Sequence, residues 1–377
     1  MNLAIVCSWL NQYGGAERVL EVVHDMYPQA PVYTSIYHPP SLPESYRDWD
    51  IRPSTLNRLP FIKRHHQPFL PFYPLGFEGL DLRGYDVVFS LTSAFAHGVL
   101  TSERTRHVCY CLTPARFLWN YPAYVEREGL GPLARWLLPP FLKNLRQWDR
   151  LAADRVDQFL AISSTVQDRI QKTYRRPSEV IFPPVRTEAI QPQGEPEDYY
   201  LVVSRLIPYK RIDLAVRAFN TLGLPLRIIG DGRDRKALQA MAAPNTQFLG
   251  YVDDAEVRRQ MAHCRAFLFP GEEDFGITPL EATAAGRPVI AYAAGGALDT
   301  IVEDETGLFF HEPTPEALAD TVRRLEGFVV HPHRLRRHVR QFSVERFQRE
   351  LDAVLRGNIG PGMPLRHCIS NAKRGSL

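Results

Sequence analysis

Two short apolar runs flank an acid- and glycine-rich loop and a helical segment in the C-terminal half of this sequence. The runs, Ala266–Phe269 and Val289–Tyr292, have the length of buried strands. Between them, Thr278 is placed to be an N-cap, Pro279 to be the first helical residue and Glu281 to complete a capping box. We therefore expect a β–loop–α–β unit, which is the building block of doubly wound α/β folds.

The loop and the start of this helix carry groups suited to a phosphate and to a sugar. In such units, ligands bind beyond the carboxyl ends of the strands, where the helix N-termini point. The free N–H groups at 276–280 favour an anion, whereas the carboxylates of Glu273 and Glu281 accept hydrogen bonds from hydroxyl groups. Each such charged hydrogen bond is worth roughly 1.5–3 kcal/mol. An anion site beside two hydroxyl-binding carboxylates fits a nucleotide sugar.

Glu273 and Glu281 are separated by seven residues, with Phe275 and Gly276 between them and the sequence Gly-Arg-Pro-Val at 286–289 after them. This pattern resembles the E-x7-E signature of the family 4 retaining glycosyltransferases. The alternative, a capped helix with solvated acids, explains a lone pair of glutamates better than it explains the whole pattern. The resemblance implies an α/β protein of the GT-B fold, with two facing Rossmann-like domains and the donor site in the cleft between them.

A second motif lies where the apolar run Tyr199–Val203 gives way to a helix. Arg205 and Lys210 both stand at this transition, so both can reach one phosphate group. They resemble the arginine and lysine that hold the donor diphosphate in the same family. Because no metal-binding motif accompanies them, these cations would stabilise the leaving diphosphate without a metal ion. We therefore expect no metal and no cofactor.

The N-terminal half begins with an apolar strand, Leu3–Ser8, followed by Gly14-Gly15 and a helix. Two adjacent glycines let the backbone approach a ligand closely. With Ala16-Glu17-Arg18 after them, they resemble the family's GGxE element, which faces the donor diphosphate. The resemblance also implies further contacts with the donor. They come from a turn at Gly230, from Tyr251 and Val252 after a strand, and from the backbone near the first glutamate at Phe275, Gly276 and Ile277.

Residues 111–119 resemble a C-H-T-P-x-R-[FY]-L-W segment of a mannosyltransferase-like branch of the family. The family's histidine beside the donor sugar is replaced here by Leu112. Either that histidine is dispensable, or His97 or Arg116 serves instead, since both follow strands. His97 has an equal alternative as a packed or surface histidine. Arg116 and Trp119 are the acceptor-side candidates.

The segment 57–77 breaks the regular pattern and mixes basic with aromatic residues. We interpret it as a loop or short amphipathic helix that contacts a membrane or a lipid-linked acceptor. The alternative is an aromatic cluster packed beneath a proline-rich loop. The tripeptide Asp48-Trp49-Asp50 matches a metal-binding D-x-D, but no strand leads into it, so we attribute the match to chance.

At 377 residues the chain exceeds the size at which one core keeps growing, so we expect two domains, 1–190 and 195–342. The resemblance implies that a last helix, at about 343–357, packs back on the first domain. A net charge of +3 calls for no nucleic acid partner. Absence of a long apolar run or signal peptide predicts a cytoplasmic protein, peripheral on the membrane if 57–77 binds lipid. Five scattered cysteines fit reduced core thiols: Cys7, Cys109, Cys111, Cys264 and Cys368.

Taken together, the resemblance implies a retaining glycosyltransferase that moves a sugar from a nucleotide diphosphate to a glycan or lipid-linked acceptor. The family's favoured mechanism is same-face displacement, in which the leaving phosphate helps to deprotonate the acceptor. The likeness to mannosyltransferases makes GDP-mannose the first expected donor and a bacterial surface polysaccharide or glycolipid the expected product. Two alternatives stay open: an epimerase or hydrolase of the same fold, and a non-catalytic nucleotide-sugar-binding protein, which Leu112 motivates.

Overall fold

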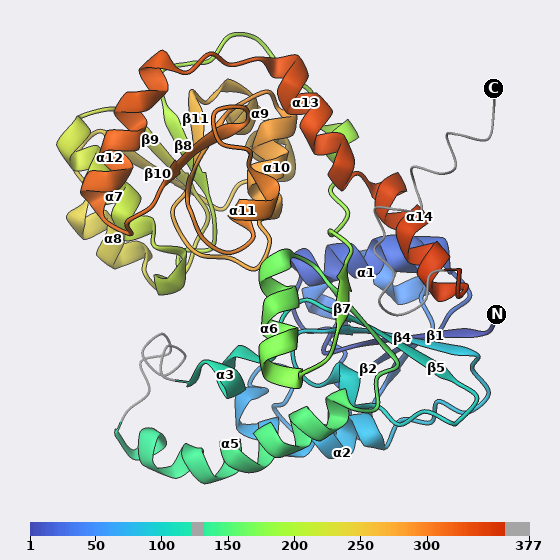
Figure 1. Ribbon diagram of the computed structural model, residues 1–377. Helices are drawn as coiled ribbons and strands as arrows, with labels where there is room; N and C mark the ends of the chain where they lie inside the picture. The colour runs from blue at the N-terminus through green and yellow to red at the C-terminus, as the bar shows by residue number, and fades with distance from the viewer. Residues whose placement is uncertain (122–131, 359–377) are drawn as a thin grey trace, which may run out of the picture. The chain divides into compact units, whose positions relative to one another are not determined.

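The computed structural model describes residues 1–121 and 132–358 (Figure 1). The chain divides into two compact units. The first consists of Met1–Pro184 and resumes at Phe347, and the second is Val185–Arg346. The helix α14, Val344–Leu355, therefore starts in the second unit and continues in the first. Cys368, which we expected to be a reduced core thiol, lies outside the described residues.

The first unit is built on a seven-stranded sheet in the order β3-β2-β1-β4-β5-β6-β7, and every neighbouring pair is parallel. Crossover helices join parallel strands, as this topology requires. The strands are β1 (Leu3–Cys7), β2 (Val32–Thr34), β3 (Ile51–Pro53), β4 (Val87–Thr92), β5 (Arg106–Cys111), β6 (Gln158–Ala161) and β7 (Ser178–Val180). The helices are α1 (Gly15–Met26), α2 (Tyr73–Glu78), α3 (Arg116–Trp119), α5 (Pro132–Ala153) and α6 (Ser164–Tyr174).

Side chains alternate across the first sheet, so each face has its own set of apolar residues. Ala4, Val6 and Val88 belong to one buried cluster with residues of α2 and α5, including Phe77 and Leu145. Helices α1 and α14 lie on the opposite face (Figure 1). There, α14 contacts the sheet through a ring pair between Phe347 and Tyr110, and the Tyr27 hydroxyl donates to Asp352 at 2.7 Å.

The second unit has a six-stranded parallel sheet in the order β10-β9-β8-β11-β12-β13. Its core packs the apolar faces of α7 and α12 against the sheet, for example Phe219 and Val322 against Leu268. The strands are β8 (Tyr200–Val203), β9 (Leu226–Ile229), β10 (Thr246–Gly250), β11 (Ala266–Phe269), β12 (Val289–Tyr292) and β13 (Gly307–Phe310). The helices are α7 (Ile212–Leu222), α8 (Arg235–Met241), α9 (Asp254–His263), α10 (Ile277–Ala284), α11 (Ala297–Thr300), α12 (Pro315–Arg324) and α13 (Pro332–Val339).

When each sheet is numbered from its own first strand, the second repeats the order of the first six strands of the first sheet, 3-2-1-4-5-6, and the first sheet adds β7 at its edge. The order places β1 beside β4 in the first unit and β8 beside β11 in the second, and the chain changes direction of winding between these strands. In open parallel sheets, ligands bind at the carboxyl ends of the strands that flank such a switch point. The fold therefore directs attention to the loops after β1, β4, β8 and β11.

Candidate functional site

In the second unit, the two predicted motifs occupy the loops at the switch point. Arg205 and Lys210 follow β8, and Glu273 follows β11, the neighbouring strand. The residues come from segments more than sixty positions apart, yet parallel neighbours end at the same edge of the sheet. The topology thus explains why the two motifs form one candidate site.

Lys210 and Glu273 form an ion pair between Nζ and Oε1. Both side chains are largely covered, with 13% and 21% of their surfaces exposed. Arg205 is exposed and donates from Nη2 to the hydroxyl of Tyr209 at 3.4 Å, while Lys210 Nζ lies 5.2 Å from the centre of the Tyr209 ring. The site therefore combines two cations, one carboxylate and one aromatic ring. Motif spacing alone did not identify Tyr209, although it adjoins Lys210 in the sequence.

Glycine at 271 allows the Glu273 loop to touch the Lys210 loop. A Cβ atom at Gly271 would lie 2.8 Å from the carbonyl oxygens of Tyr209 and Lys210, closer than real Cβ atoms come to such atoms. A side chain there would push the two loops apart. The contact between Lys210 and Glu273 therefore depends on the missing side chain of Gly271.

The turn Gly295-Gly296, which follows β12, packs against the same loop. The Gly296 N–H donates to the Glu273 carbonyl at 2.8 Å. A Cβ at Gly295 would lie 2.2 Å from that carbonyl oxygen, and one at Gly296 would lie 2.2 Å from Cα of Phe275. These two glycines therefore support the loop that carries Glu273.

Gly230 plays a comparable part on the other side of the site. Its φ is 125°, a value that favours glycine, and a Cβ would lie 1.9 Å from the Ser204 carbonyl oxygen. Gly232 approaches Leu206 in the same way, at 2.2 Å. Both glycines therefore allow their backbone to pack closely against the loop that carries Arg205. Whether Gly230 also contacts a donor stays a prediction.

The predicted capping box at Thr278 is wrong. Helix α10 begins at Ile277, one position before the predicted cap, and its N-cap is Gly276 with no side-chain hydrogen bond. Gly276 has φ 96°, and a Cβ there would lie 2.9 Å from the Phe269 ring. The left-handed backbone at a glycine sets the helix start, which a search for polar caps misses. Glu281 still lies on this helix and is half-buried.

The other predicted donor contacts are spread over nearby segments of the second unit. Phe275 is buried and its ring lies 5.9 Å from that of Phe342, while Ile277 opens α10. Tyr251 follows β10 and is 88% exposed, and Val252 beside it is half-buried. Tyr251 thus presents a ring to solvent. The roles of these residues in binding a donor stay predictions.

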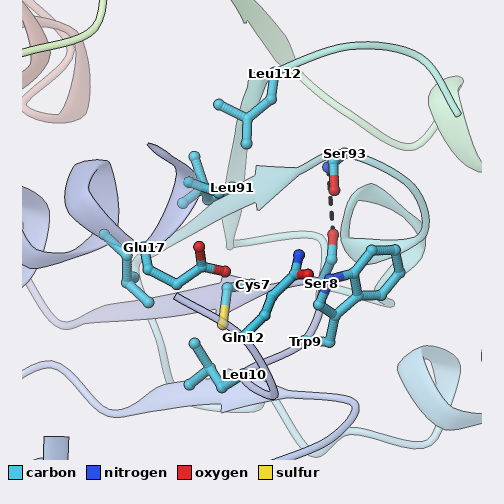
Figure 2. A pocket seen from close by; sticks show the side chains of 11 residues that line it. Cys7, Ser8, Trp9, Leu10, Gln12, Glu17, Leu91, Ser93 and Leu112 are labelled. Carbon is cyan, nitrogen blue, oxygen red and sulfur yellow. Dashed lines mark hydrogen bonds between the residues drawn. The ribbon is translucent and has the colours of Figure 1, made fainter. Parts of the chain in front are cut away.

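In the first unit, Gly14 is the N-cap of α1 and Gly15 its first residue. Close to this turn, a cavity of about 40 Å³ lies between the ends of β1 and β4 (Figure 2). Gln12 points into it from the loop after β1 and the buried Glu17 from the first turn of α1, and Leu112 lines it just beyond the end of β5. Leu112, where the resemblance led us to expect a histidine, therefore lies near the start of α1 and adds an apolar wall.

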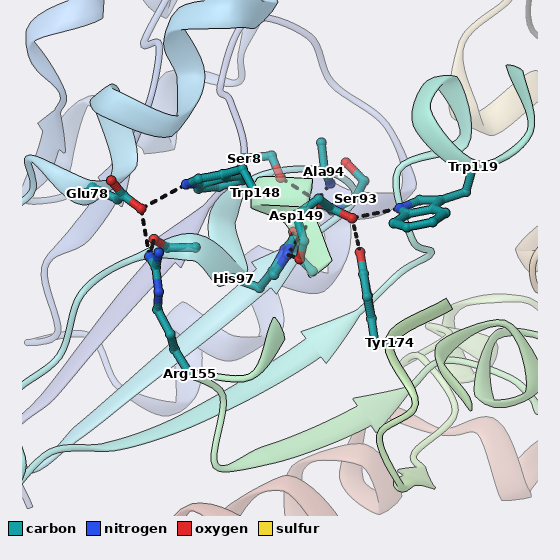
Figure 3. Close-up of polar contacts among 12 residues, drawn as sticks. Ser8, Glu78, Ser93, Ala94, His97, Trp119, Trp148, Asp149, Arg155 and Tyr174 are labelled. Carbon is teal, nitrogen blue, oxygen red and sulfur yellow. Dashed lines mark hydrogen bonds and ion pairs between the residues drawn. The ribbon is translucent and has the colours of Figure 1, made fainter. Parts of the chain in front are cut away.

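His97 is fully buried, which is the packed alternative for this residue. Its Nε2 lies 3.4 Å from Oδ1 of Asp149, which is also buried, and its Nδ1 lies 3.4 Å from the Thr92 hydroxyl (Figure 3). The other carboxylate oxygen of Asp149 accepts from Trp119 Nε1 at 2.7 Å and from the Tyr174 hydroxyl at 2.9 Å. A catalytic role for His97 stays a prediction, and its surroundings are those of a structural network.

Burial raises the pKa of the Asp149 carboxyl, and the neighbouring His97 and the hydrogen bonds from Trp119 and Tyr174 oppose this rise. The network fixes Trp119, whose side chain still has 38% of its surface exposed. Arg116 lies one helical turn before it in α3 and is half-buried. Both acceptor-side candidates thus stand on α3. The sequence analysis missed Asp149, because one aspartate in an amphipathic helix is usually solvated.

The segment 57–77 contains both of the alternatives that the sequence left open. Ile62, Tyr73 and Phe77 are buried in the core of the first unit, as expected for a packed cluster. Phe61 and Phe72 are 79% and 50% exposed, as expected for a surface that contacts lipid. Within the described ranges, no helix is both long and apolar enough to cross a bilayer. Residues 1–121 and 132–358 likewise hold no group of three His, Cys, Asp or Glu arranged for a metal ion.

Comparison with known proteins places this architecture in a defined class. Residues 185–342 match the family model described as glycosyl transferases group 1. The GDP-mannose-dependent alpha-mannosyltransferase of Mycolicibacterium smegmatis is 32% identical over 243 residues, which cover 60% of this chain and 61% of the relative. An uncharacterised glycosyltransferase of Methanocaldococcus jannaschii is 24% identical over 289 residues, covering 75% of this chain and 78% of the relative.

Among solved structures, HepE of Anabaena in complex with UDP matches with a TM-score of 0.70 and 16% identity, covering 95% of this chain and 100% of HepE. This likeness confirms the predicted α/β fold with two Rossmann-like domains of the GT-B type. The matched domain and the named relatives identify the protein as a glycosyltransferase.

Proposed function

We propose that this glycosyltransferase moves a sugar, with mannose as the first choice, from a nucleotide diphosphate to a glycan or lipid-linked acceptor, with retention and without a metal ion. The observation that carries the proposal is the meeting of Lys210 with Glu273 at the switch point of the second sheet. Similarity to a GDP-mannose-dependent relative supports GDP-mannose as the donor. The diphosphate of such a donor needs a cation, which Lys210 supplies. Its sugar needs an acceptor for hydroxyl hydrogen bonds, which Glu273 supplies.

In this proposal each group has a distinct part. Arg205 and Lys210 hold the diphosphate and offset the charge that grows on it as the sugar leaves. Glu273 accepts hydrogen bonds from the sugar hydroxyls, and Glu281 accepts them from the ribose. Because Lys210 already contacts Glu273, the lysine can connect the diphosphate with the sugar-binding carboxylate. The site would thereby hold the two sides of the bond that breaks.

The proposed reaction is a same-face displacement. The bond between the sugar's anomeric carbon and the diphosphate oxygen breaks, and the acceptor oxygen forms a new bond on the same face. The acceptor proton passes to the leaving phosphate oxygen. The chain contributes mainly charge stabilisation and positioning, which are large terms in group transfer.

A thermal-shift panel of nucleotide diphosphates and nucleotide sugars, without added metal, tests the donor proposal. A ligand at about 100 times its dissociation constant adds roughly 2.7 kcal/mol of stability. The nucleotides that carry the correct nucleobase should therefore raise the melting temperature clearly. The Arg205→Ala variant should lose this shift because it lacks the exposed cation of the site. Arg217→Ala, an exposed arginine on α7, is the matched control and should keep it. A panel in which no nucleotide stabilises the protein would contradict the proposal.

We further propose that segment 57–77 rests on an anionic membrane surface, where a lipid-linked acceptor would be found. Its exposed apolar side chains include Phe61, Phe72 and Leu75, and the exposed bases Arg58 and Arg64 lie in the same segment. Apolar insertion combined with attraction to anionic lipid is the usual basis of such binding.

Flotation with vesicles tests the membrane proposal. The protein should float with vesicles that contain phosphatidylglycerol and float less in high salt, since salt screens the bases. The Phe61→Ser, Phe72→Ser double variant should float several-fold less than the wild type. A control change at Val329, which is exposed on the second unit, should have no effect. Failure of the wild type to float at any salt concentration would reject this contact.

A further inference from the structure

A second, larger hollow opens in the first unit beside the start of α1. Its volume is about 410 Å³, within the range of small-molecule sites. It lies between the loop after β1 and the chain at 63–67. All of its lining residues are polar, and no carboxylate is among them: Asn11, Gln12, His38, Ser41, Lys63, Arg64, His66 and Gln67.

The two cations in this pocket lack counter-charges. Neither Lys63 nor Arg64 has an ion-pair or side-chain hydrogen-bond partner within the residues that the structure describes. Many other arginines of the same unit do have one, such as Arg52 with Asp50 and Arg155 with Glu78, at 2.6 and 2.8 Å. Two adjacent unpaired cations facing a carboxylate-free hollow favour a bound anion.

The pocket has a fixed frame. The Asn11 amide donates to the Lys63 carbonyl at 3.2 Å, and His38 Nδ1 lies 2.8 Å from the Ser41 hydroxyl. The His66 ring packs 5.0 Å from the Trp9 ring, and its buried Nδ1 has no hydrogen-bond partner in the described chain. Phe61 has φ 61° and starts the turn that presents the cations, with its carbonyl accepting from Arg64 N at 3.1 Å. These contacts hold the walls of the hollow in place.

We propose that this pocket binds a phosphate group carried by the sugar acceptor. This inference rests on the proposed function, because it names the chemical class of the molecule that receives the sugar. A phosphate monoester carries close to two negative charges at neutral pH, which matches two cations, and its three oxygens suit the amide, hydroxyl and imidazole groups. Gln12 lines both this pocket and the cavity beside Gly14, so the phosphate would lie near the edge of β1 where ligands bind in such sheets.

Acetylation of individual lysines, followed by mass spectrometry, tests the pocket directly. At inorganic phosphate ten times above its dissociation constant, acetylation of Lys63 should slow about tenfold at constant ionic strength. Lys172 is an exposed lysine of the same unit and should react at an unchanged rate. Equal rates for Lys63 in phosphate and in chloride, or equal protection by acetate, would overturn the proposal.

Two further arms identify the source of the phosphate. Soluble glycerol 3-phosphate and phosphatidylcholine vesicles with phosphatidic acid are compared, with pure phosphatidylcholine vesicles and vesicles of the same negative charge made with phosphatidylglycerol as the controls. Protection by phosphatidic acid counts only where it exceeds protection by phosphatidylglycerol, because segment 57–77 is expected to bind any anionic surface. Protection by the soluble compound alone indicates a water-soluble acceptor, and protection by phosphatidic acid vesicles alone indicates a lipid-linked one. Protection by both supports recognition of the phosphate itself. Protection by neither, or equal protection by pure phosphatidylcholine, contradicts the proposal.

Variants separate this proposal from the donor proposal. Arg64→Gln should lose most of the phosphate protection at Lys63 and should keep the thermal shift caused by a nucleotide diphosphate. Arg205→Ala should show the reverse pattern, because Arg205 lies in the second unit. If nucleotides give no shift while Lys63 stays protected, the donor assignment fails and the phosphate pocket stands. If Arg64→Gln keeps full protection, the pocket assignment fails.

Discussion

Replacing Lys210 with methionine is expected to lower kcat/KM for sugar transfer by roughly 10²–10³, the range seen when one preorganised stabiliser of developing charge is removed. Methionine keeps much of the side-chain length and volume, so the change removes mainly the charge. The lysine lies at the switch point and contacts Glu273, so its loss removes a cation that we propose holds the diphosphate and leaves the carboxylate without its ion-pair partner. A coupled assay with the nucleotide sugar identified by thermal shift measures the effect.

The matched control is Lys236→Met. Lys236 lies on α8 of the same unit and is exposed, so its loss should change kcat/KM by less than about twofold. Analysis of the products adds a second check, since a transferase forms a glycoside and a hydrolase releases free sugar. Similar rates for Lys210→Met and Lys236→Met would refute the proposed part of the ion pair in transfer.

Sequence reasoning was most successful where local pattern and tertiary structure agree. In the second unit, strands β11 and β12 were predicted residue for residue, because buried parallel strands appear as continuous apolar runs. The two motifs at Lys210 and Glu273 could be assigned to one site from the sequence, because the loops that follow neighbouring parallel strands lie at the same edge of the sheet. The ion pair itself was not predicted, since spacing gives proximity but not side-chain direction.

Errors and omissions arose where the backbone or the packing departs from local rules. The start of α10 was misplaced because Gly276 adopts a left-handed conformation against the Phe269 ring, and no polar cap marks it. Strand β3, Ile51–Pro53, was missed because it is a short edge strand that ends in proline. The pocket at Lys63 and Arg64 was not predicted, and these two residues were interpreted only as part of a basic and aromatic segment. Its walls come from three separate loops, which no sequence window contains.

The largest predicted effect on stability concerns Asp149. Replacing it with leucine should destabilise the first unit by roughly 3–5 kcal/mol, the cost of removing one partner from a buried charged network. The change leaves Trp119 Nε1 and the Tyr174 hydroxyl without their acceptor and removes the carboxylate that faces His97. Figure 3 shows how these three groups converge on the one carboxylate.

Urea unfolding followed by tryptophan fluorescence can measure this loss in the first unit alone. All five tryptophans of the chain precede residue 184, so their signal does not report on the second unit. With a slope of roughly 2–3 kcal/mol per molar urea, the midpoint should fall by about 1–2 M. The control is Asp154→Leu: Asp154 is 53% exposed and pairs with Arg150 at the surface, so its loss should cost at most about 1 kcal/mol. Equal shifts for the two variants would contradict the network's importance.

A milder variant connects the Asp149 network with acceptor binding. Tyr174→Phe removes one hydrogen bond to the carboxylate, and we expect a loss of about 1.5–3 kcal/mol with the fold retained. Asp149 then still holds Trp119, so acceptor KM should stay near the wild-type value. In Asp149→Asn the side chain is neutral, so its hydrogen bond from Trp119 Nε1 becomes weaker. Trp119 is then held less firmly, and the KM for the acceptor should rise several-fold. The nucleotide-induced thermal shift should be the same in both variants, because Arg205, Lys210 and Glu273, which we propose to hold the donor, lie in the second unit. An unchanged acceptor KM in Asp149→Asn would show that Trp119 takes no part in binding the acceptor.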